Sequence, residues 1–211
     1  MSLTQPWELP SGWSWSSLGE LADHDSGEWG KDPGEAEVDV PVVRSTETRT
    51  LVADVHAAEV RSLTKTQFEK TALADEDILV VKSSGSQHLV GRPSIVLGLN
   101  GTDAGFSNFM LRLRAKEGVH ARLLFGYLAS PAARALFLRL NRTTSGLRNL
   151  VLDRYLRVPV PKGEPEVEQE LLANLDTVED AVAAARETER LLEELRLSTL
   201  LAAFDAPRFE P

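Results

Sequence analysis

The chain has 211 residues, of which 42% are hydrophobic and 26% are charged. This balance suits a soluble protein with one sizeable core, or one domain plus an extension. No apolar run approaches the roughly 20 residues that a membrane-spanning helix needs, and the first residues lack the basic and apolar regions of a secretory signal. The absence of cysteine excludes disulfides, thiolate metal sites and cysteine nucleophiles, and we expect a cytoplasmic protein.

The net charge of −9 is unevenly distributed along the chain. Residues 1–40 carry one basic and nine acidic side chains, residues 41–160 carry 17 basic and 10 acidic, and residues 161–211 carry five basic and 13 acidic. Most basic residues of the middle segment are arginines, which suit bidentate contacts with phosphate and with guanine. This distribution predicts a nucleic-acid-binding body between two acidic ends. The alternative is that individual arginines pair with nearby acids.

The first half of the chain predicts one short helix and two strands. A serine cap before Leu18–Leu21 predicts the helix, and the acidic, glycine-containing residues 23–39 predict a loop. Residues 38–43 alternate between apolar and other residues and predict a strand. The apolar run at 77–82 predicts a buried strand that is followed by a polar loop.

The second half predicts two further strands and a pair of helices. The strands are expected at residues 94–97 and 109–113. Apolar spacing over residues 119–139 predicts helices, with Pro131 in the first turn of the second one, where its missing N–H is harmless. Residues 150–160 are predicted to be extended.

A long helix is predicted from residue 164 to about residue 204. Apolar residues recur there at spacings of three and four, and neither glycine nor proline occurs between Pro165 and Pro207. The stripe consists of Leu171, Leu175, Val178, Val182, Ala185, Leu192 and Leu195. Some 40 helical residues extend about 60 Å, which is longer than a domain of this size, so the helix needs a partner surface. The alternative is a helix folded back onto its own domain.

Several segments, in the same order, resemble the specificity subunits of type I restriction–modification systems. They are Leu9-Pro-Ser-Gly-Trp-Ser-Trp15 with Leu18-Gly-Glu-Leu21, Val40-Pro-Val-Val-Arg-Ser45, Asp77-Ile-Leu-Val-Val-Lys-Ser-Ser-Gly-Ser86, and Thr144-Ser-Gly-Leu-Arg-Asn-Leu150 with Tyr155-Leu-Arg-Val-Pro-Val-Pro161 and Glu168-Gln169. The resemblance covers residues 7 to about 200. The acidic segment 23–39 departs from the family pattern.

The resemblance implies an α+β fold in which a globular, mixed α/β target-recognition domain at 1–161 precedes a coiled-coil-forming helix at 162–204 and a tail at 205–211. A usual family member has two recognition domains and two long helices, whereas this chain has one of each. It would therefore pair with another copy or with a related half. The implied function is sequence-specific recognition of double-stranded DNA.

The same resemblance implies that the chemistry comes from partners. Methyltransferase subunits would bring S-adenosylmethionine, and a translocase/nuclease subunit would bring ATP and Mg²⁺. No cofactor is expected in this chain.

Polar side chains on loops are the candidates for contacts with DNA. The first group consists of Arg44, Thr46, Lys82, Ser84, Ser86, Gln87, His88 and Arg92, and the second consists of Asn108, Arg142, Ser145, Arg148 and Asn149. Asparagine and glutamine can bond an adenine edge, arginine a guanine, and serine or lysine a phosphate. The alternatives are that the serines only form a turn, that His88 is an ordinary surface histidine and that Asn149 is a local cap.

Enzymatic motifs are missing from the sequence. The acidic residues 75–77, the strand and Lys82 resemble a metal-dependent nuclease core, but such a core needs an acid two positions before the lysine, where this chain has Val80. The sequence has no phosphate-binding Gly-Lys-Ser/Thr loop, no metal spacing among its histidines and no nucleophile motif. We therefore expect a non-catalytic protein. Two alternatives to an active specificity subunit stay open: a protein–protein adaptor that dimerises through its helix without binding DNA, and a truncated, regulatory specificity subunit.

Overall fold

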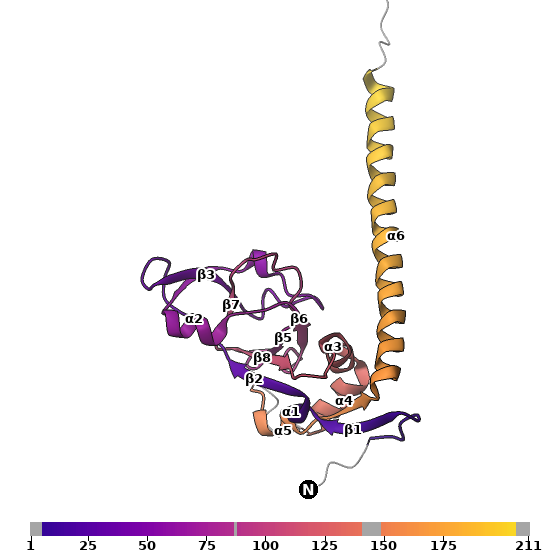
Figure 1. Ribbon diagram of the computed structural model, residues 1–211. Helices are drawn as coiled ribbons and strands as arrows, with labels where there is room; N and C mark the ends of the chain where they lie inside the picture. The colour runs from indigo at the N-terminus through magenta and orange to yellow at the C-terminus, as the bar shows by residue number, and fades with distance from the viewer. Residues whose placement is uncertain (1–5, 87, 141–148, 206–211) are drawn as a thin grey trace, which may run out of the picture. The chain divides into compact units, whose positions relative to one another are not determined.

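A computed structural model describes residues 6–86, 88–140 and 149–205. The chain divides into two units, Met1–Gly163 and Glu164–Pro211. The first unit is globular and contains both helices and strands, and the second is one long helix (Figure 1). The predicted α+β class with a long C-terminal helix is therefore confirmed. No helix within the described ranges combines the length and the hydrophobicity needed to span a membrane.

The globular unit contains nine described strands. They are β1 (Trp13–Ser17), β2 (Ala22–Ser26), β3 (Val38–Val43), β4 (Val60–Leu63), β5 (Ile78–Val81), β6 (Pro93–Ile95), β7 (Gly105–Phe106), β8 (Met110–Ala115) and β9 (Pro159–Gly163). Its described helices are α1 (Leu18–Leu21), the 3-10 helix η1 (Val55–Ala57), α2 (Lys65–Thr71), α3 (Ala121–Ala129), α4 (Pro131–Leu140) and α5 (Leu152–Leu156). The second unit contains α6 (Pro165–Asp205).

The central sheet has the strand order β2-β8-β5-β6, and all its neighbours are antiparallel. All four residues of the inner strand β5 are buried. Successive side chains of a strand point to opposite faces of the sheet, and a hydrophobic core covers each face here. Ile78 and Val80 pack into the core beneath the helices α3 and α4, whereas Leu79 and Val81 pack into a second core on the other face. A strand covered on both faces is apolar throughout, and this is the pattern from which the strand was predicted.

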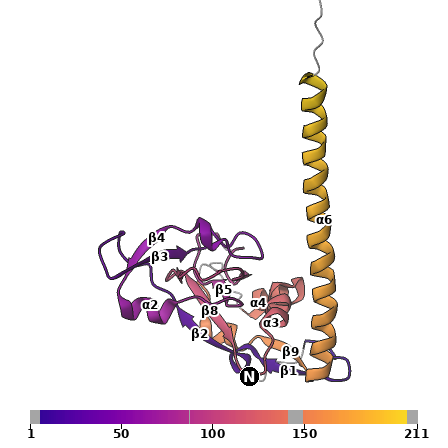
Figure 2. The same cartoon turned by 45° about the horizontal axis from the view of Figure 1, so that its top comes forward.

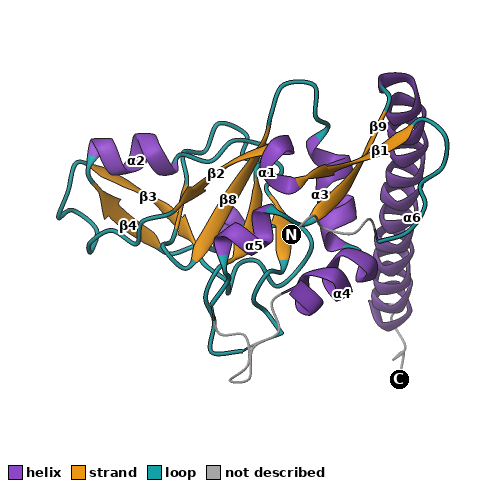
Figure 3. Ribbon diagram, turned by 90° about the horizontal axis from the view of Figure 1, so that it is seen from below, coloured by secondary structure: helices purple, strands orange, loops and turns teal. Residues whose placement is uncertain are grey.

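Two smaller sheets flank the central one. The sheet β4-β3-β7 lies with α2 at one end of the globular unit, and the pair β1–β9 lies at the opposite end (Figures 1 and 2). Seen from below, the central strands β2 and β8 run between these two ends (Figure 3). Trp13 pairs with Gly163 in the β1–β9 register, so the start of the globular unit is tied to its last residue.

Three of the predicted elements form for the reasons read from the sequence. The backbone N–H of Ser17 donates to the Glu20 carboxylate at 2.7 Å and begins α1. Pro131 is the first residue of α4, as predicted. The long helix α6 extends from Pro165 to Asp205 without interruption.

Two predictions about local structure were wrong. Residues 150–160 are not extended throughout, because Leu152–Leu156 form α5, which places Tyr155 in the core with only 2% of its surface exposed. Residues 23–39 are not only loop, since most of β2 lies there and pairs with β8. The acidic composition of β2 is not typical of a strand, so the sequence did not predict it. The strand forms by pairing with the distant strand β8, and the contact of Asp25 with Arg112 joins the two.

Candidate nucleic-acid interface

Many arginines of the basic segment bind acids of the same protein. Arg112 contacts Asp25 at 2.5 Å, Arg61 contacts Asp32 at 2.6 Å, and both oxygens of the buried Asp77 accept hydrogen bonds from Arg114 at 2.7 Å. The bonds with Asp77 raise the pKa of Arg114. Arg44 lies between the carboxylates of Glu47 and Glu59, at 3.4 and 3.2 Å. The guanidinium groups of these four arginines therefore serve internal pairing.

The folded units have a different charge balance from the sequence segments. Unit Met1–Gly163 carries 19 basic and 19 acidic residues, and unit Glu164–Pro211 carries four basic and 13 acidic ones. The acidic N-terminal segment is joined to the basic one by the pairs of Asp25 and Asp32. The globular unit thus has no net charge, and any attraction for nucleic acid must come from a local group of side chains.

Two further arginines hold backbone carbonyls instead of acids. Arg92 donates to the Thr48 carbonyl, and Arg134 donates to the carbonyls of Val90 and His88. Burial lowers the pKa of both guanidinium groups. The Arg134 guanidinium also lies 5.3 Å from the centre of the Phe137 ring. Arg134 thereby fastens α4 to the loop between β5 and β6.

The end of β5 gathers polar groups from four separate segments. The Lys82 ammonium donates to the Ser26 hydroxyl at the end of β2. The Ser83 hydroxyl donates to the Asn149 side-chain oxygen at 2.6 Å. The backbone N–H groups of Lys82 and Ser83 donate to the Phe109 carbonyl, at 2.8 and 3.2 Å. We call this group the polar edge. It consists of the bonded residues Ser26, Lys82, Ser83, Phe109 and Asn149, together with their neighbours in sequence Ser84, Ser86 and Asn108.

Five residues that the sequence pointed to lie at the polar edge: Lys82, Ser84, Ser86, Asn108 and Asn149. His88 is exposed nearby, with its carbonyl bound by Arg134. Thr46 is exposed and donates its hydroxyl to Glu47, whereas the guanidinium groups of Arg44 and Arg92 face protein partners. A contact of any of these residues with DNA stays a prediction. Four candidates lie outside the described residues, namely Gln87, Arg142, Ser145 and Arg148.

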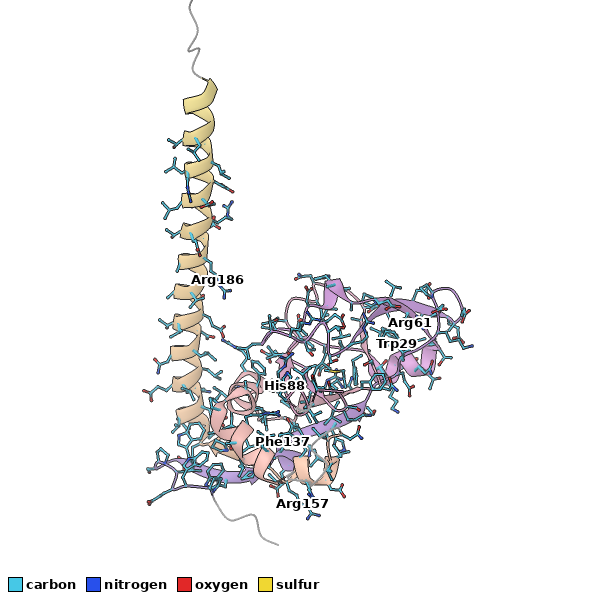
Figure 4. All side chains as sticks on the ribbon, turned by 180° about the vertical axis from the view of Figure 1, so that it is seen from behind. Trp29, Arg61, His88, Phe137, Arg157 and Arg186 are labelled. Atoms are coloured by element: carbon cyan, nitrogen blue, oxygen red, sulfur yellow. The ribbon has the colours of Figure 1, made fainter. Side chains whose placement is uncertain are left out.

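A hollow of about 340 Å³ lies beside the polar edge and shares Asn108 with it. Trp29 and Lys31 also line this hollow. The Trp29 ring is held by two arginines, with Arg44 at 5.1 Å and Arg61 at 4.8 Å from its centre. Figure 4 shows Trp29 and Arg61 side by side. These cation–π contacts fix the wall of the hollow.

Sequence reasoning missed Ser26, Lys31 and Phe109. Ser26 and Lys31 lie in the acidic segment, and only the pairing of β2 with β8 brings Ser26 to the end of β5. For Lys31 one signal was available, because it is the one basic residue among residues 1–40. Phe109 was assigned to a strand, although it lies in the turn before β8. Within the described ranges, no group of three potential metal ligands occurs.

The chain is similar to type I specificity subunits in sequence and in fold. It is 22% identical over 157 residues to the type I restriction enzyme EcoKI specificity subunit of Escherichia coli (strain K12), a match that covers 71% of this chain and 34% of that subunit. No protein-family model matches the chain.

Two solved structures cover nearly the whole chain. The HsdS subunit from Thermoanaerobacter tengcongensis aligns with a TM-score of 0.56 and 20% identity over 97% of this chain and 48% of that one. A chain from a study of complex assembly and conformational transition of the type I R-M system aligns with a TM-score of 0.59 and 19% identity, with the same coverage. This chain spans about a third of the curated relative and about half of these structures. The resemblance inferred from the sequence motifs is confirmed.

Proposed function

We propose that this chain recognises one half of a split DNA site as the specificity component of a type I restriction–modification complex. One observation carries the proposal: the alignments with specificity-subunit structures take in 97% of this chain, so its long helix is aligned along with its globular domain. In this proposal, the chain supplies the address and the architecture but no catalysis.

The polar edge supports a reading surface for duplex DNA. Its hydroxyl and amide groups can donate to and accept from base edges, and the Lys82 ammonium suits a backbone phosphate. These groups lie on loops that are held by a buried sheet, which is how binding residues are usually presented. Methyltransferase subunits with S-adenosylmethionine, and a translocase/nuclease subunit with ATP and Mg²⁺, would perform the reactions in the cytoplasm.

The helix α6 supports pairing with protein instead of DNA. Its apolar stripe is solvent-exposed in this chain, with exposures of 43% for Leu171, 59% for Val178, 62% for Leu192 and 64% for Leu195. The net charge of its unit is −9, which would repel DNA. A second copy, or a related half-length chain, would cover the stripe, and the helix length would then set the spacer between two half-sites.

The function is tested by co-purifying the full chain with its methyltransferase and mapping modified bases across the genome. We expect modification at one split motif. The Lys82→Met and Asn149→Ala double variant should reduce modification at that motif by at least tenfold, because a phosphate contact and a base-edge contact are lost. The matched control is Lys70→Met, which removes an exposed charge from the far end of α2.

Two outcomes would contradict this assignment. One is modification that does not depend on the chain, and the other is an unchanged motif and rate in the double variant. Together they would favour the adaptor alternative, which the neutral globular unit supports. The affinity of a DNA-reading chain for DNA should also fall as the salt concentration rises. An adaptor should not bind DNA at any salt concentration.

A second prediction concerns α6. The Val178→Asp and Leu192→Asp double variant should convert a dimer into a monomer, because each substitution places a carboxylate in the apolar seam. Light scattering after size-exclusion chromatography measures the mass. The control adds the same charge with Ala184→Asp and Ser198→Asp, two exposed positions away from the stripe, and should leave the dimer intact. Equal masses for the double variant and the unmodified chain would exclude the stripe as the pairing surface.

A further inference from the structure

The turn between β7 and β8 presents two adjacent side chains at its tip. The Met110 N–H donates to the Ser107 carbonyl at 2.9 Å, so Ser107–Met110 form a β-turn with Asn108 and Phe109 at its central positions. Ser107 and Met110 are buried, whereas Asn108 is exposed and the Phe109 side chain is 51% exposed. The turn therefore carries one amide and one aromatic ring into solvent.

Three other segments hold this turn from below. The Ser107 N–H donates to the Val43 carbonyl at 2.9 Å, and the Phe109 carbonyl accepts two N–H groups from the end of β5. Gly27 lies so close to the start of the turn that a Cβ atom there would lie 2.4 Å from the Ser107 carbonyl oxygen and 2.1 Å from that of Phe106. Since the backbone is bound on three sides, the tip is preorganised, and little conformational entropy would be lost on binding.

Within the described part of the chain, Phe109 does not pack into a hydrophobic core and the Asn108 side chain does not hydrogen-bond another element. Phe109 belongs to none of the hydrophobic clusters, and among the described residues the Asn108 amide has no hydrogen-bond partner. Leu51 is even more exposed, at 61%, but it lies beside β6 at the other end of β5, and the hydroxyl of its neighbour Thr50 donates to the Val52 carbonyl at 2.7 Å. Phe109 is instead bordered by Asn108 and by Lys82, both of which suit nucleic acid.

We propose that this turn reads one A·T base pair in the major groove. This inference rests on the proposed function. The Asn108 amide would bond the N6 and N7 positions of adenine, and the Phe109 ring would contact the C5-methyl group of the paired thymine. The adenine edge and the thymine methyl group belong to one base pair and both face the major groove. The Asn108 and Phe109 side chains occupy adjacent positions of one turn, so they can contact these two groups together. Phe109 is thus assigned as a residue that determines specificity.

The test uses the full chain in complex with its methyltransferase and duplexes that carry the mapped motif. Each thymine is replaced in turn by deoxyuridine, which lacks the methyl group, and each adenine by 7-deazaadenine, which lacks the N7 acceptor. Fluorescence anisotropy gives the dissociation constants. One deoxyuridine should weaken binding by roughly fourfold, which corresponds to one buried methyl group, and the 7-deazaadenine of the same pair should weaken it by about fivefold or more.

The variants connect these losses to the two side chains. Phe109→Ala should bind the thymine-containing duplex about as weakly as the unmodified chain binds the deoxyuridine duplex. Its own affinity should no longer change when that thymine is replaced by deoxyuridine. Asn108→Ala should behave in the same way towards the 7-deazaadenine. Phe109→Leu retains an apolar contact and should recover part of the response to the methyl group. Leu51→Ala, the matched control, should respond as the unmodified chain does, and thermal unfolding should show that all four variants fold.

The outcomes separate this inference from the proposed function. If the complex selects a motif but both Phe109→Ala and Asn108→Ala keep the unmodified responses, the reading by the turn is wrong and the proposed function stands. A mapped motif that has no A·T pair in the half-site read by this chain would likewise contradict the reading by the turn and leave the proposed function standing. If the complex selects no motif, the proposed function fails, and the inference fails with it.

Discussion

Replacing Arg112 by alanine is expected to lower the free energy of unfolding by about 2–4 kcal/mol. The Arg112 side chain is only 8% exposed, and it joins β8 both to Asp25 on β2 and to the Ala72 carbonyl, at 2.5 and 2.7 Å. Truncation removes the shorter of the two hydrogen bonds to that carbonyl, which keeps only the bond from Arg114 at 3.3 Å. It also creates a cavity beside Phe106, whose ring centre lies 5.5 Å from the guanidinium. The value lies below that for a fully buried ion pair because Asp25 is 39% exposed and can be hydrated.

Urea denaturation of the full chain, followed by tryptophan fluorescence, measures this loss. The control is Arg157→Ala, which removes an exposed guanidinium that projects from the unit just after α5 (Figure 4) and should change stability by less than about 0.5 kcal/mol. DNA affinity below the unfolding transition should be the same for Arg112→Ala and the unmodified chain. A large loss of affinity with unchanged stability would mean that this arginine reads DNA, contrary to its internal pairing.

Arg112 also shows why the charge pattern of the sequence was an incomplete guide. The contrast between residues 1–40 and 41–160 predicted a basic body, yet Asp25 and Arg112 meet across 87 positions of sequence. Their contact follows from the antiparallel register of β2 with β8, in which they are direct partners. Opposite charges that are far apart in the chain cancel when tertiary pairing brings them together, and no local pattern reports this.

The elements that were predicted correctly are those whose reason is local. The apolar run of β5 and the uninterrupted spacing of α6 identify these elements without any knowledge of their neighbours. In contrast, β2 has only one buried residue, Ala22, and exists because β8 offers it a free edge. The short helix α5 was missed because one turn of helix around Tyr155 is too short to show a period.

The candidate site divides in the same way. Residue types that suit DNA contacts could be selected from the sequence, and Lys82 and Asn149 do lie at one edge. Their proximity could not be derived, because Asn149 meets Ser83 across 66 positions of sequence. Phe109 could not be selected at all, since an apolar residue within a predicted strand is expected to be buried, and only the turn geometry shows that it is exposed.

Replacing Gly91 by alanine is expected to lower the free energy of unfolding by about 2–5 kcal/mol. The backbone of Gly91 has a φ of +77°, which disfavours any residue with a Cβ atom, and a Cβ atom there would lie 2.3 Å from the Phe137 ring. That ring is only 2% exposed and packs edge to face against Tyr155 at 5.3 Å, so it cannot move aside. The conformational and the steric penalty therefore act together.

Other glycines of the chain separate these two penalties. Gly118 has a φ of +76° but open space around it, so Gly118→Ala should cost only about 1–2 kcal/mol. Gly85 has neither constraint, and Gly85→Ala should be close to neutral. In the Gly91→Ala background, Phe137→Leu should cost less than it does alone, because the smaller side chain relieves the clash. Strict additivity of the two changes would exclude direct contact as the cause.

The same substitution reports on recognition, because Gly91 follows the two carbonyls that Arg134 binds. A Cβ atom there would push the loop between β5 and β6 away from α4 and would break the bonds of Arg134 to His88 and Val90. Discrimination between the motif and single-base variants should therefore fall in Gly91→Ala, even at temperatures where the chain is folded, but not in Gly118→Ala. Unchanged discrimination in a folded Gly91→Ala chain would show that the loop reads DNA without support from α4, or that it does not read DNA.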